Sequence, residues 1–386
     1  MTCIHHALFA TTTNVPTESS FYHRNVEPFL QNRDSERWHI FARHALAIAG
    51  FSPLTAQFLK LCIDEHTRFC DPRLRITLDQ KRTFDNPLLV GAGWDKTGSA
   101  AYGLYTLGFA GEETGTVVPL PQPGNQKPRQ EVKDGVCLNS LGFNSPGMLA
   151  VQQNVYRAQN LGIPLGINIG KNKETSLENA VNDYVAVLRC LYLYATYIAI
   201  NVSSPNTVGL RDLQQTKFLA DILQALNDTM RELGILLPLF VKISPDLTFQ
   251  QLDEVIDTVL LQHAAGIIAA NTTTNELLKA AYGWQGKSGG ISGNDPTYKR
   301  MVLTIVDYIF SKTKGQLQVI GVGGISTADD AWNMITHGAS LVQVVTGIRN
   351  IGPSIAGKIN RGLMKQLDKE GIDNIINAVG IHASRN

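Results

Sequence analysis

Amide and ammonium side chains recur in this sequence directly after short apolar runs. The residues that share this placement are Lys96, Asn139, Asn168, Asn201, Asn206, Lys242 and Asn271, and the hydroxyl residue Thr272 follows the last of them. Several amides and two ammoniums in one place suit a flat, polar, anionic ring ligand, because amides both donate and accept while ammoniums balance negative charge. The alternative is that the amides only hydrogen bond to each other and to loops, and that the lysines lie at the surface.

Glycine-rich turns follow two apolar runs near the C-terminal end. They are Gly321-Val322-Gly323-Gly324 and Thr346-Gly347. Glycine lets the backbone approach a ligand closely, and backbone N–H groups at such turns bind phosphate. The first apolar run is not followed by a GxGxxG pattern with an acidic residue about 20 positions later, so a Rossmann dinucleotide site is not indicated.

A serine follows the fourth apolar run, in Ser203-Ser204-Pro205. A loop serine is more often a turn former than a catalyst, and Ser204 can act as a base only from a fixed position with a proton relay. Ser204 does not lie in the GxSxG elbow of hydrolases, since its neighbours are Val202-Ser203 and Pro205-Asn206, so a catalytic triad built on it has little support. His, Asp and Glu do not cluster with metal-ligand spacing, and we expect no metal.

The elements that must position these residues alternate between short apolar runs and segments of helix length. The eight runs are 87–90, 109–113, 164–169, 197–201, 239–243, 266–271, 318–322 and 340–344. Continuous apolar strands that alternate with helices indicate buried parallel strands. Eight such units match the α/β architecture of a (β/α)8 TIM barrel, whose active site lies at the C-terminal ends of the strands. An open, doubly wound sheet is the alternative.

The first 75 residues differ from the rest. We interpret 1–20 as a flexible polar lead, 21–75 as a small helical microdomain and 76–386 as the barrel. The lead is rich in Ser and Thr, so an organelle-targeting segment is an alternative. The helical unit either packs on the barrel as a hairpin or forms an amphipathic lid that dips into a bilayer surface.

Two helices are predicted in this unit. Asp34 or Ser35 can cap the first, and Gly50 ends it. Ser52-Pro53 begins the second, with serine at the N-cap and proline at the first helical position. The apolar positions of the second helix are Leu54, Phe58, Leu61 and Cys62.

Composition excludes several classes of protein. The 386 residues include 34 basic and 33 acidic ones, a net charge of +1, which argues against a dedicated nucleic-acid binder. The five cysteines show no CxxC spacing, so neither a disulfide framework nor a zinc site is indicated. The longest apolar runs are shorter than the roughly 18 residues of a membrane span.

Several of these segments, taken in order, resemble the dihydroorotate dehydrogenase family over about residues 84–370. The segments are Gly91–Lys96, Asn139–Asn144, Gly166–Lys173, Asn201–Thr207 with Gly209-Leu210-Arg211, Asn271–Thr273, Gly289–Gly293 and Gly321–Ile325. The leader segment Ser35-Glu36-Arg37-Trp38-His39 resembles the N-terminal microdomain of class 2, the quinone-dependent branch. Serine at position 204, where class 1 carries cysteine, agrees with class 2.

The resemblance implies an FMN-containing barrel that oxidises (S)-dihydroorotate to orotate, the fourth step of pyrimidine synthesis. Ser204 would take the C5 proton as hydride passes from C6 to flavin N5, and Lys96 and Lys242 complete the catalytic set. The implied substrate residues are Lys96, Asn139, Ser140, Leu141, Gly142, Phe143, Asn201, Asn206, Asn271 and Thr272. The implied FMN residues are Ala92, Gly93, Trp94, Asp95, Lys96, Thr116, Asn139, Asn168, Asn201, Lys242, Ala270, Ser292, Gly293, Gly323, Val345 and Thr346.

Quinone would enter between the two leader helices. The resemblance therefore implies a peripheral protein on the cytoplasmic side of the cell membrane, or on the mitochondrial inner membrane in a eukaryote. Two other interpretations remain open. One is an FMN-binding barrel with an altered acceptor or lost turnover, and the other is a related FMN oxidoreductase that acts on a different ring or on a 2-hydroxy acid.

Several positions depart from the family pattern. Ser140 stands where arginine is usual, Ala270 where a hydroxyl residue is common, Val345 where tyrosine is common, and Leu120 where a basic residue is frequent. The segment 130–133 lacks the arginine that is usual near the quinone tunnel. The last departure leaves the electron acceptor less certain than the oxidation of dihydroorotate.

Overall fold

The computed structural model describes residues 35–49, 52, 54–55, 69–79, 81–207 and 209–384. The predicted lead at 1–20 and the predicted second-helix residues Phe58, Leu61 and Cys62 lie outside these residues. The first predicted helix is present as α2 (Ser35–Ala49), with the bounds that its capping residues indicated.

Eight parallel strands close into a barrel, which confirms the predicted fold and excludes the open sheet. The strands are β3 (Leu88–Val90), β4 (Glu112–Val117), β7 (Leu165–Ile169), β8 (Tyr197–Asn201), β9 (Leu239–Lys242), β10 (Gly266–Ala269), β12 (Gln318–Val322) and β13 (Ala339–Val344). Each pairs with its predecessor among them, and β13 pairs with β3 to close the ring. The eight predicted runs are these eight strands.

The largest difference from the sequence interpretation is at β4. The apolar pattern placed this strand at 109–113, but it begins at Glu112 and continues to Val117. Four of its residues, Glu112, Glu113, Thr114 and Thr116, are polar yet buried. The strand pairs with β7 through a register shift after Thr114. Hydropathy could not reveal it, because buried polar residues in a strand interrupt the apolar run.

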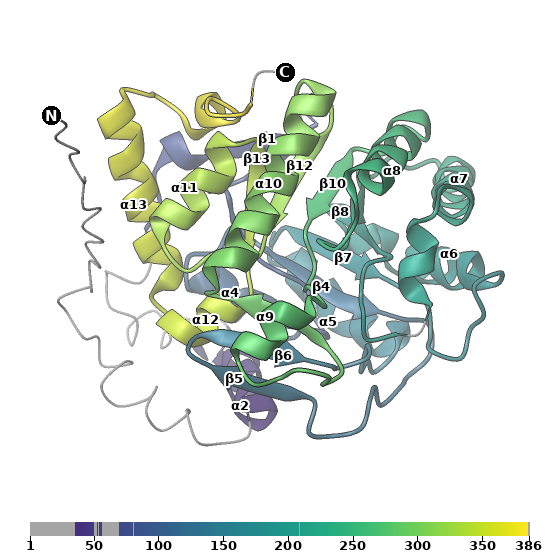
Figure 1. Cartoon of the computed structure of the whole chain (residues 1–386). Coiled ribbons are helices and arrows are strands. Elements are labelled where there is room, and N and C mark those ends of the chain that lie inside the picture. The colour runs from purple at the N-terminus through teal and green to yellow at the C-terminus, as the bar shows by residue number, and fades with distance from the viewer. Residues whose placement is uncertain are drawn as a thin grey trace, which may run out of the picture.

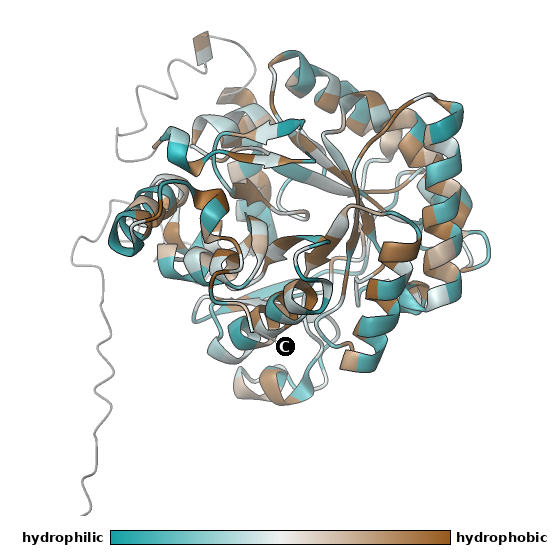
Figure 2. Cartoon of the chain, turned by 90° about the horizontal axis from the view of Figure 1, so that it is seen from above, coloured by the Kyte–Doolittle hydropathy of each residue, from teal (hydrophilic) through white to brown (hydrophobic). Residues whose placement is uncertain are grey.

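Helices surround the barrel in the order expected of βα units (Figure 1). They are α4 (Ala101–Thr106), α5 (Met148–Asn160), α6 (Ala180–Leu191), α7 (Thr216–Glu232), α8 (Phe249–Leu261), α9 (Glu276–Ala281), α10 (Pro296–Thr313), α11 (Ala328–Thr336), α12 (Thr346–Ile351) and α13 (Ile355–Glu370). Seen from above, the strands are hydrophobic, while the helices turn hydrophilic residues outward (Figure 2). Among the described residues, no helix is long and apolar enough to cross a membrane.

Local sequence explains where the main helices begin. Thr248 and Gln251 form a reciprocal capping box at the start of α8. Asp295 caps α10, which has Pro296 at its first position. These caps satisfy N–H groups that would otherwise lack partners at the helix start.

A second sheet lies beside the barrel. It has three antiparallel strands in the order β11 (Gly290–Gly293), β6 (Val136–Asn139) and β5 (Gln130–Lys133). Helix α2 contacts both β5 and α4, and α2, β5 and β6 lie together on the lower side of the molecule in Figure 1. A short hairpin of β1 (Ile76–Leu78) and β2 (Arg82–Phe84) precedes the barrel.

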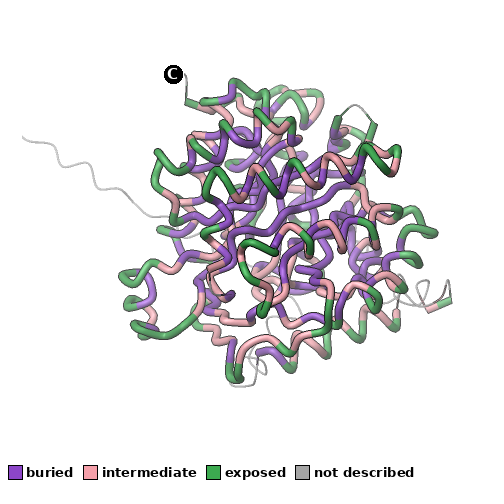
Figure 3. Tube along the Cα trace, turned by 90° about the vertical axis from the view of Figure 1, so that its right-hand side faces the viewer, coloured by how far each residue is buried: buried purple, intermediate pink, exposed green. Residues whose placement is uncertain are grey.

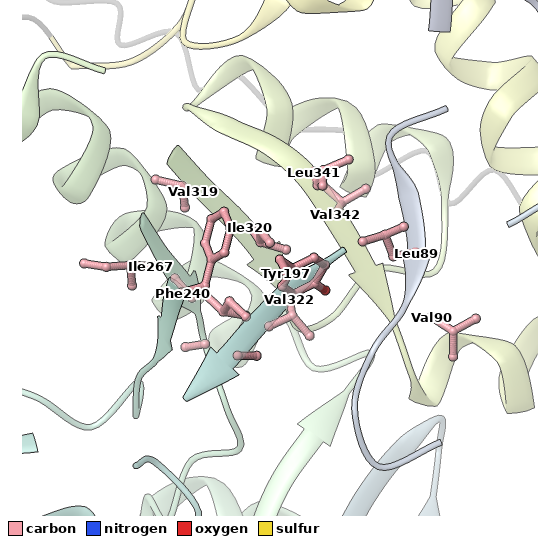
Figure 4. Close-up of a cluster of buried hydrophobic side chains, with 14 of the residues drawn as sticks. Leu89, Val90, Tyr197, Phe240, Ile267, Val319, Ile320, Val322, Leu341 and Val342 are labelled. Carbon is pink, nitrogen blue, oxygen red and sulfur yellow. The ribbon is translucent and has the colours of Figure 1, made fainter. Parts of the chain in front are cut away.

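The core fills the barrel and the layer between strands and helices (Figure 3). In Figure 4, Tyr197 of β8 and Phe240 of β9 lie next to each other, with ring centroids 5.4 Å apart. A side chain at Gly166 would clash with the Tyr197 ring, since a Cβ there lies 2.2 Å from its Cζ. This close approach explains why β7 carries glycine facing a large aromatic residue.

Candidate functional site

A cavity of about 810 Å³ lies at the C-terminal ends of the barrel strands, between them, the three-stranded sheet and α2. Every site residue proposed from the sequence lines it except Asp95, Asn168 and Ser140. The closed barrel thus gathers side chains that are far apart in the chain into one site, as the strand-end argument predicted.

At the base of the site, the carboxylate of Glu113 receives four hydrogen bonds. Oε1 accepts from Lys242 Nζ at 3.0 Å and from Asn168 Nδ2 at 2.8 Å. Oε2 accepts from Gln343 Nε2 at 2.6 Å and from Tyr197 OH at 3.0 Å. All five residues are buried, so this charge is compensated by direct partners rather than by water.

Neighbouring strands carry a linked row of amides and hydroxyls above this carboxylate. Thr116 Oγ1 donates to Asn168 Oδ1 at 2.6 Å, and Asn201 Nδ2 donates to Thr116 Oγ1 at 2.8 Å. Asn271 Nδ2 donates to Ser203 Oγ at 3.0 Å, and Ser203 in turn donates to Asn201 Oδ1. The amides therefore do bond one another, and this row fixes the orientation of those that line the cavity.

Three buried polar atoms of cavity-lining residues have no hydrogen-bond partner among the described residues: Ser35 Oγ at the start of α2, Thr272 Oγ1 and Gln343 Oε1. Thr272 follows β10, and Gln343 lies in β13. Buried polar atoms are nearly always paired in folded proteins, so these two are acceptors available to a bound ligand.

Ser204 is 5% exposed and faces the cavity. Its Oγ accepts a hydrogen bond from the backbone N–H of Asn206 at 3.2 Å, and Asn206 Nδ2 donates to Asn139 Oδ1 at 3.1 Å. The first contact orients the Ser204 hydroxyl, and the second joins its loop to the segment that begins at Asn139. The described residues place no histidine within hydrogen-bond distance of Ser204, so a hydrolase triad gains no support.

Lys96 is the second ammonium of the site. Nζ donates to Asn144 Oδ1 at 2.5 Å. Burial lowers its pKa to about 7, with repulsion from Arg129 and Arg43 adding to the effect and Glu36 opposing it. With a pKa of about 7, Lys96 is only partly protonated at physiological pH, and the binding of an anion beside it would favour the protonated, charged form.

Glycine and hydroxyl residues converge where β11, β12 and β13 end. Ser292 Oγ lies 3.1 Å from Thr346 Oγ1. Gly323 has a φ of +134°, and a Cβ there would lie 2.8 Å from Tyr298 OH. Only glycine fits this position, and without a side chain its backbone can be approached closely by a ligand in the cavity.

Three predicted residues act from behind the cavity wall. Asp95 accepts hydrogen bonds from the backbone N–H groups of Thr97 and Ala100, and thereby shapes the loop after β3. Asn168 lies in the row described above. Ser140 contributes through its backbone: its N–H donates to Arg129 O at 2.8 Å, and its carbonyl accepts from Asn125 Nδ2.

Helix α2 closes one side of the cavity. His39 Nε2 lies 2.6 Å from the Trp94 carbonyl, and burial lowers the pKa of His39 to about 4, so the neutral ring donates this bond. Arg43 donates to Thr97 and Ser99 at 3.0 and 2.7 Å. These contacts join the helix to the loop that carries Lys96.

Sequence reasoning missed four residues that shape this site. Three of them, Glu113, Gln343 and Tyr197, lie within the barrel strands and are buried. Only Glu113 carried a signal in the sequence, because it is an acidic residue at the end of a predicted apolar strand. The segment 130–133 contains no arginine, but Arg129, directly before it, is buried and lines the cavity. Its hydrogen-bond partner, Glu36, lies 93 positions earlier in the sequence, and no local sequence pattern reveals such a pair.

Comparisons with known proteins agree with this geometry. A sequence model described as dihydroorotate dehydrogenase matches residues 76–367. The dihydroorotate dehydrogenase (quinone) of Roseiflexus sp. (strain RS-1) is 38% identical over 359 residues, 92% of this chain and 97% of that protein. The protein of the same name from Trichodesmium erythraeum (strain IMS101) is 43% identical over 81% of this chain and 84% of that protein. The crystal structure of DHODH from Eimeria tenella in complex with ferulenol has a TM-score of 0.81 and 33% identity, covering 90% of this chain and 96% of that chain.

Glu113→Ala should lower the free energy of unfolding by about 3–5 kcal/mol, because it leaves the Lys242 ammonium buried without a carboxylate. Glu232→Ala is the matched control: it breaks the exposed pair with Arg189 and should cost less than about 1 kcal/mol. Urea denaturation followed by circular dichroism measures both. Equal losses in the two variants would show that the interior carboxylate has no special role.

Proposed function

Because this chain belongs to the dihydroorotate dehydrogenase family, whose quinone-dependent members it matches, we propose that it oxidises (S)-dihydroorotate with FMN in the cavity, as a step of pyrimidine synthesis. The chain is an oxidoreductase of this family, and its relatives support quinone as the acceptor. The observation that carries the proposal is that nearly all residues implied for substrate and flavin line one cavity.

The residues present fit FMN. The cavity volume lies within the range of small-molecule sites. Gly293 and Gly323 have positive φ values, and together with Thr346 they offer backbone and a hydroxyl to a phosphate. Lys242 would hold the pyrimidine edge of the flavin ring, where its positive charge stabilises added negative charge. When bound, FMN supplies the two-electron acceptor for the substrate hydride.

The remaining polar side chains suit dihydroorotate. Lys96 would pair with its carboxylate, and the amides of Asn139, Asn206 and Asn271 would bind its ring N–H and carbonyl groups. Thr272 Oγ1, which has no partner among the described residues, is a further acceptor for a ring N–H. The substrate would thus be held by its planar, polar edges.

Ser204 would remove the C5 proton of dihydroorotate. A serine hydroxyl is a weak base on its own, so its position and the exclusion of water must assist it. The backbone bond from Asn206 fixes its orientation, and its burial keeps the reacting atoms away from bulk water.

The acceptor would reach the cavity beside α2. Ser35, His39 and Leu46 of this helix line that side. Phe41 lines it too and is 62% exposed, and Ile48 is 68% exposed. A helix that lines the cavity and carries exposed apolar side chains supports quinone access from a membrane surface. We propose peripheral membrane association on this basis.

Purified protein should be yellow, and dihydroorotate should bleach its flavin absorbance under anaerobic conditions. The reduced protein is then divided and offered a quinone, fumarate or NAD in parallel. Rapid return of the absorbance with quinone alone supports the proposed acceptor. A yellow protein that dihydroorotate does not bleach would instead be a flavin-binding barrel without this activity.

Ser204→Ala should retain FMN and slow flavin reduction by about 10²–10⁴-fold, because the general base is lost. Stopped-flow absorbance with saturating dihydroorotate measures the rate. Ser311→Ala is the matched control, because the Ser311 hydroxyl bonds to the Ser384 carbonyl and does not line the cavity. A wild-type reduction rate in the Ser204 variant would remove this residue from the role of base.

Binding of orotate should weaken as pH rises through about 7. Lys96 must carry its proton to pair with the carboxylate, and its pKa lies at about 7. The dissociation constant should therefore rise about tenfold between pH 6 and 8. Titration of the flavin spectrum with orotate measures it, and Lys96→Met should bind weakly with no such step. A flat profile in the wild-type protein would contradict the role of Lys96.

A further inference from the structure

A buried ion pair links α2 to the loop that precedes β5. Arg129 Nη2 donates to Glu36 Oε1 at 2.7 Å, and Nε lies 3.1 and 3.2 Å from the two carboxylate oxygens. The two residues are 8% and 7% exposed. Burial raises the pKa of Glu36, but the hydrogen bonds and charge of Arg129 outweigh it and hold the pKa below its ordinary value. The pair is therefore fully charged at neutral pH.

The same guanidinium holds the loop around it. Arg129 Nη1 donates to the carbonyls of Pro123 and Asn125 at 2.7 and 2.8 Å. All three of its nitrogens are thus engaged, one side with α2 and the other with the loop. An arginine that bridges two segments by fixed, directional bonds sets their relative position.

Asn125 carries this arrangement to the proposed substrate segments. Its Nδ2 donates to the carbonyls of Ser140 and Asn206, both at 3.0 Å, and its backbone N–H donates to Leu141 O at 3.0 Å. Two of these partners belong to the Asn139–Phe143 segment, and the third lies two residues after Ser204. A continuous set of hydrogen bonds therefore runs from Glu36 to both sides of the substrate pocket.

Charge acts along the same route. The charged and titratable groups that face Lys96 among the described residues are Arg129 before β5, Glu36, His39 and Arg43 of α2, and Asp95 beside it. Arg129 and Arg43 repel the ammonium, while Glu36 attracts it. The carboxylate on α2 therefore offsets cations that would otherwise drive the proton from Lys96.

We propose that Glu36 is a positioning residue for dihydroorotate: through Arg129 it holds the substrate pocket in shape and supports the charge on Lys96. This inference rests on the proposed function. It means that docking of α2, on the acceptor side of the cavity, strengthens substrate binding on the other side. Because coupling is reciprocal, an occupied substrate pocket also favours the docked helix.

Orotate titrations of the FMN-loaded full chain, followed by the flavin spectrum from pH 6 to 9, test the proposal. Glu36→Gln should weaken orotate binding about tenfold at pH 7. It should also move the pH at which binding weakens downward, because Lys96 loses a favourable charge. Arg129→Gln should weaken binding too but move this pH upward, because a repulsive charge is lost. A purely structural role would not shift the two profiles in opposite directions.

Two further variants complete the test. Glu36→Asp keeps the charge and should retain the wild-type pH midpoint even if the shorter side chain weakens binding. Lys127→Gln removes an exposed cation 3.9 Å from Glu36 that does not face Lys96, and it should bind orotate as the wild type does. Wild-type affinity and midpoint in Glu36→Gln, or shifts of the same sign in Glu36→Gln and Arg129→Gln, overturn the proposal. Failure of the wild type to bind orotate overturns the proposed function itself.

Discussion

The carboxylate of Glu113 is buried inside a closed barrel, and the site depends on how this group is compensated. Removing a carboxylate from water is costly, so it persists only with good partners. Four strands each supply one: Lys242, Asn168, Gln343 and Tyr197. Each donor is thereby fixed in direction, and two of them, Lys242 and Gln343, line the cavity.

The two halves of the cavity are connected to each other as well as to the barrel. The loop after β3 carries Lys96 and is joined to α2 by His39 and Arg43. The opposite wall is joined to α2 by Glu36 and Arg129. Helix α2 thus contacts both walls, so an acceptor bound beside it and a substrate bound beyond it share a single structural support.

The sequence was sufficient to predict the fold, because buried parallel strands are continuous apolar runs and eight of them close a barrel. It also predicted the site as a region, since strand ends meet at one face. The sequence did not predict which face of a strand each side chain occupies. Glu112 and Glu113 are adjacent, yet Glu113 points into the barrel while Glu112 bonds to Thr114 on the other face, where burial raises its pKa well above normal.

Long-range pairs were also beyond local patterns. Arg129 and Glu36 are each unremarkable in sequence, and only the packing of α2 against β5 brings them together. Local patterns also do not show which amides hydrogen bond to which partners. Asn168 and Asn201 both bond to Thr116 because the register of their strands brings them together, not because of their spacing in the sequence. Register and helix docking are tertiary properties, which is why these contacts needed the structure.

The central claim, that the interior carboxylate and the Lys242 ammonium act as one unit, is tested most directly by a double-mutant cycle. The free energy of unfolding is measured for the wild type, Glu113→Gln, Lys242→Met and the double variant. The second substitution should cost far less once the first is present, with a coupling of at least about 1 kcal/mol. Losses that add to within about 0.3 kcal/mol would contradict it.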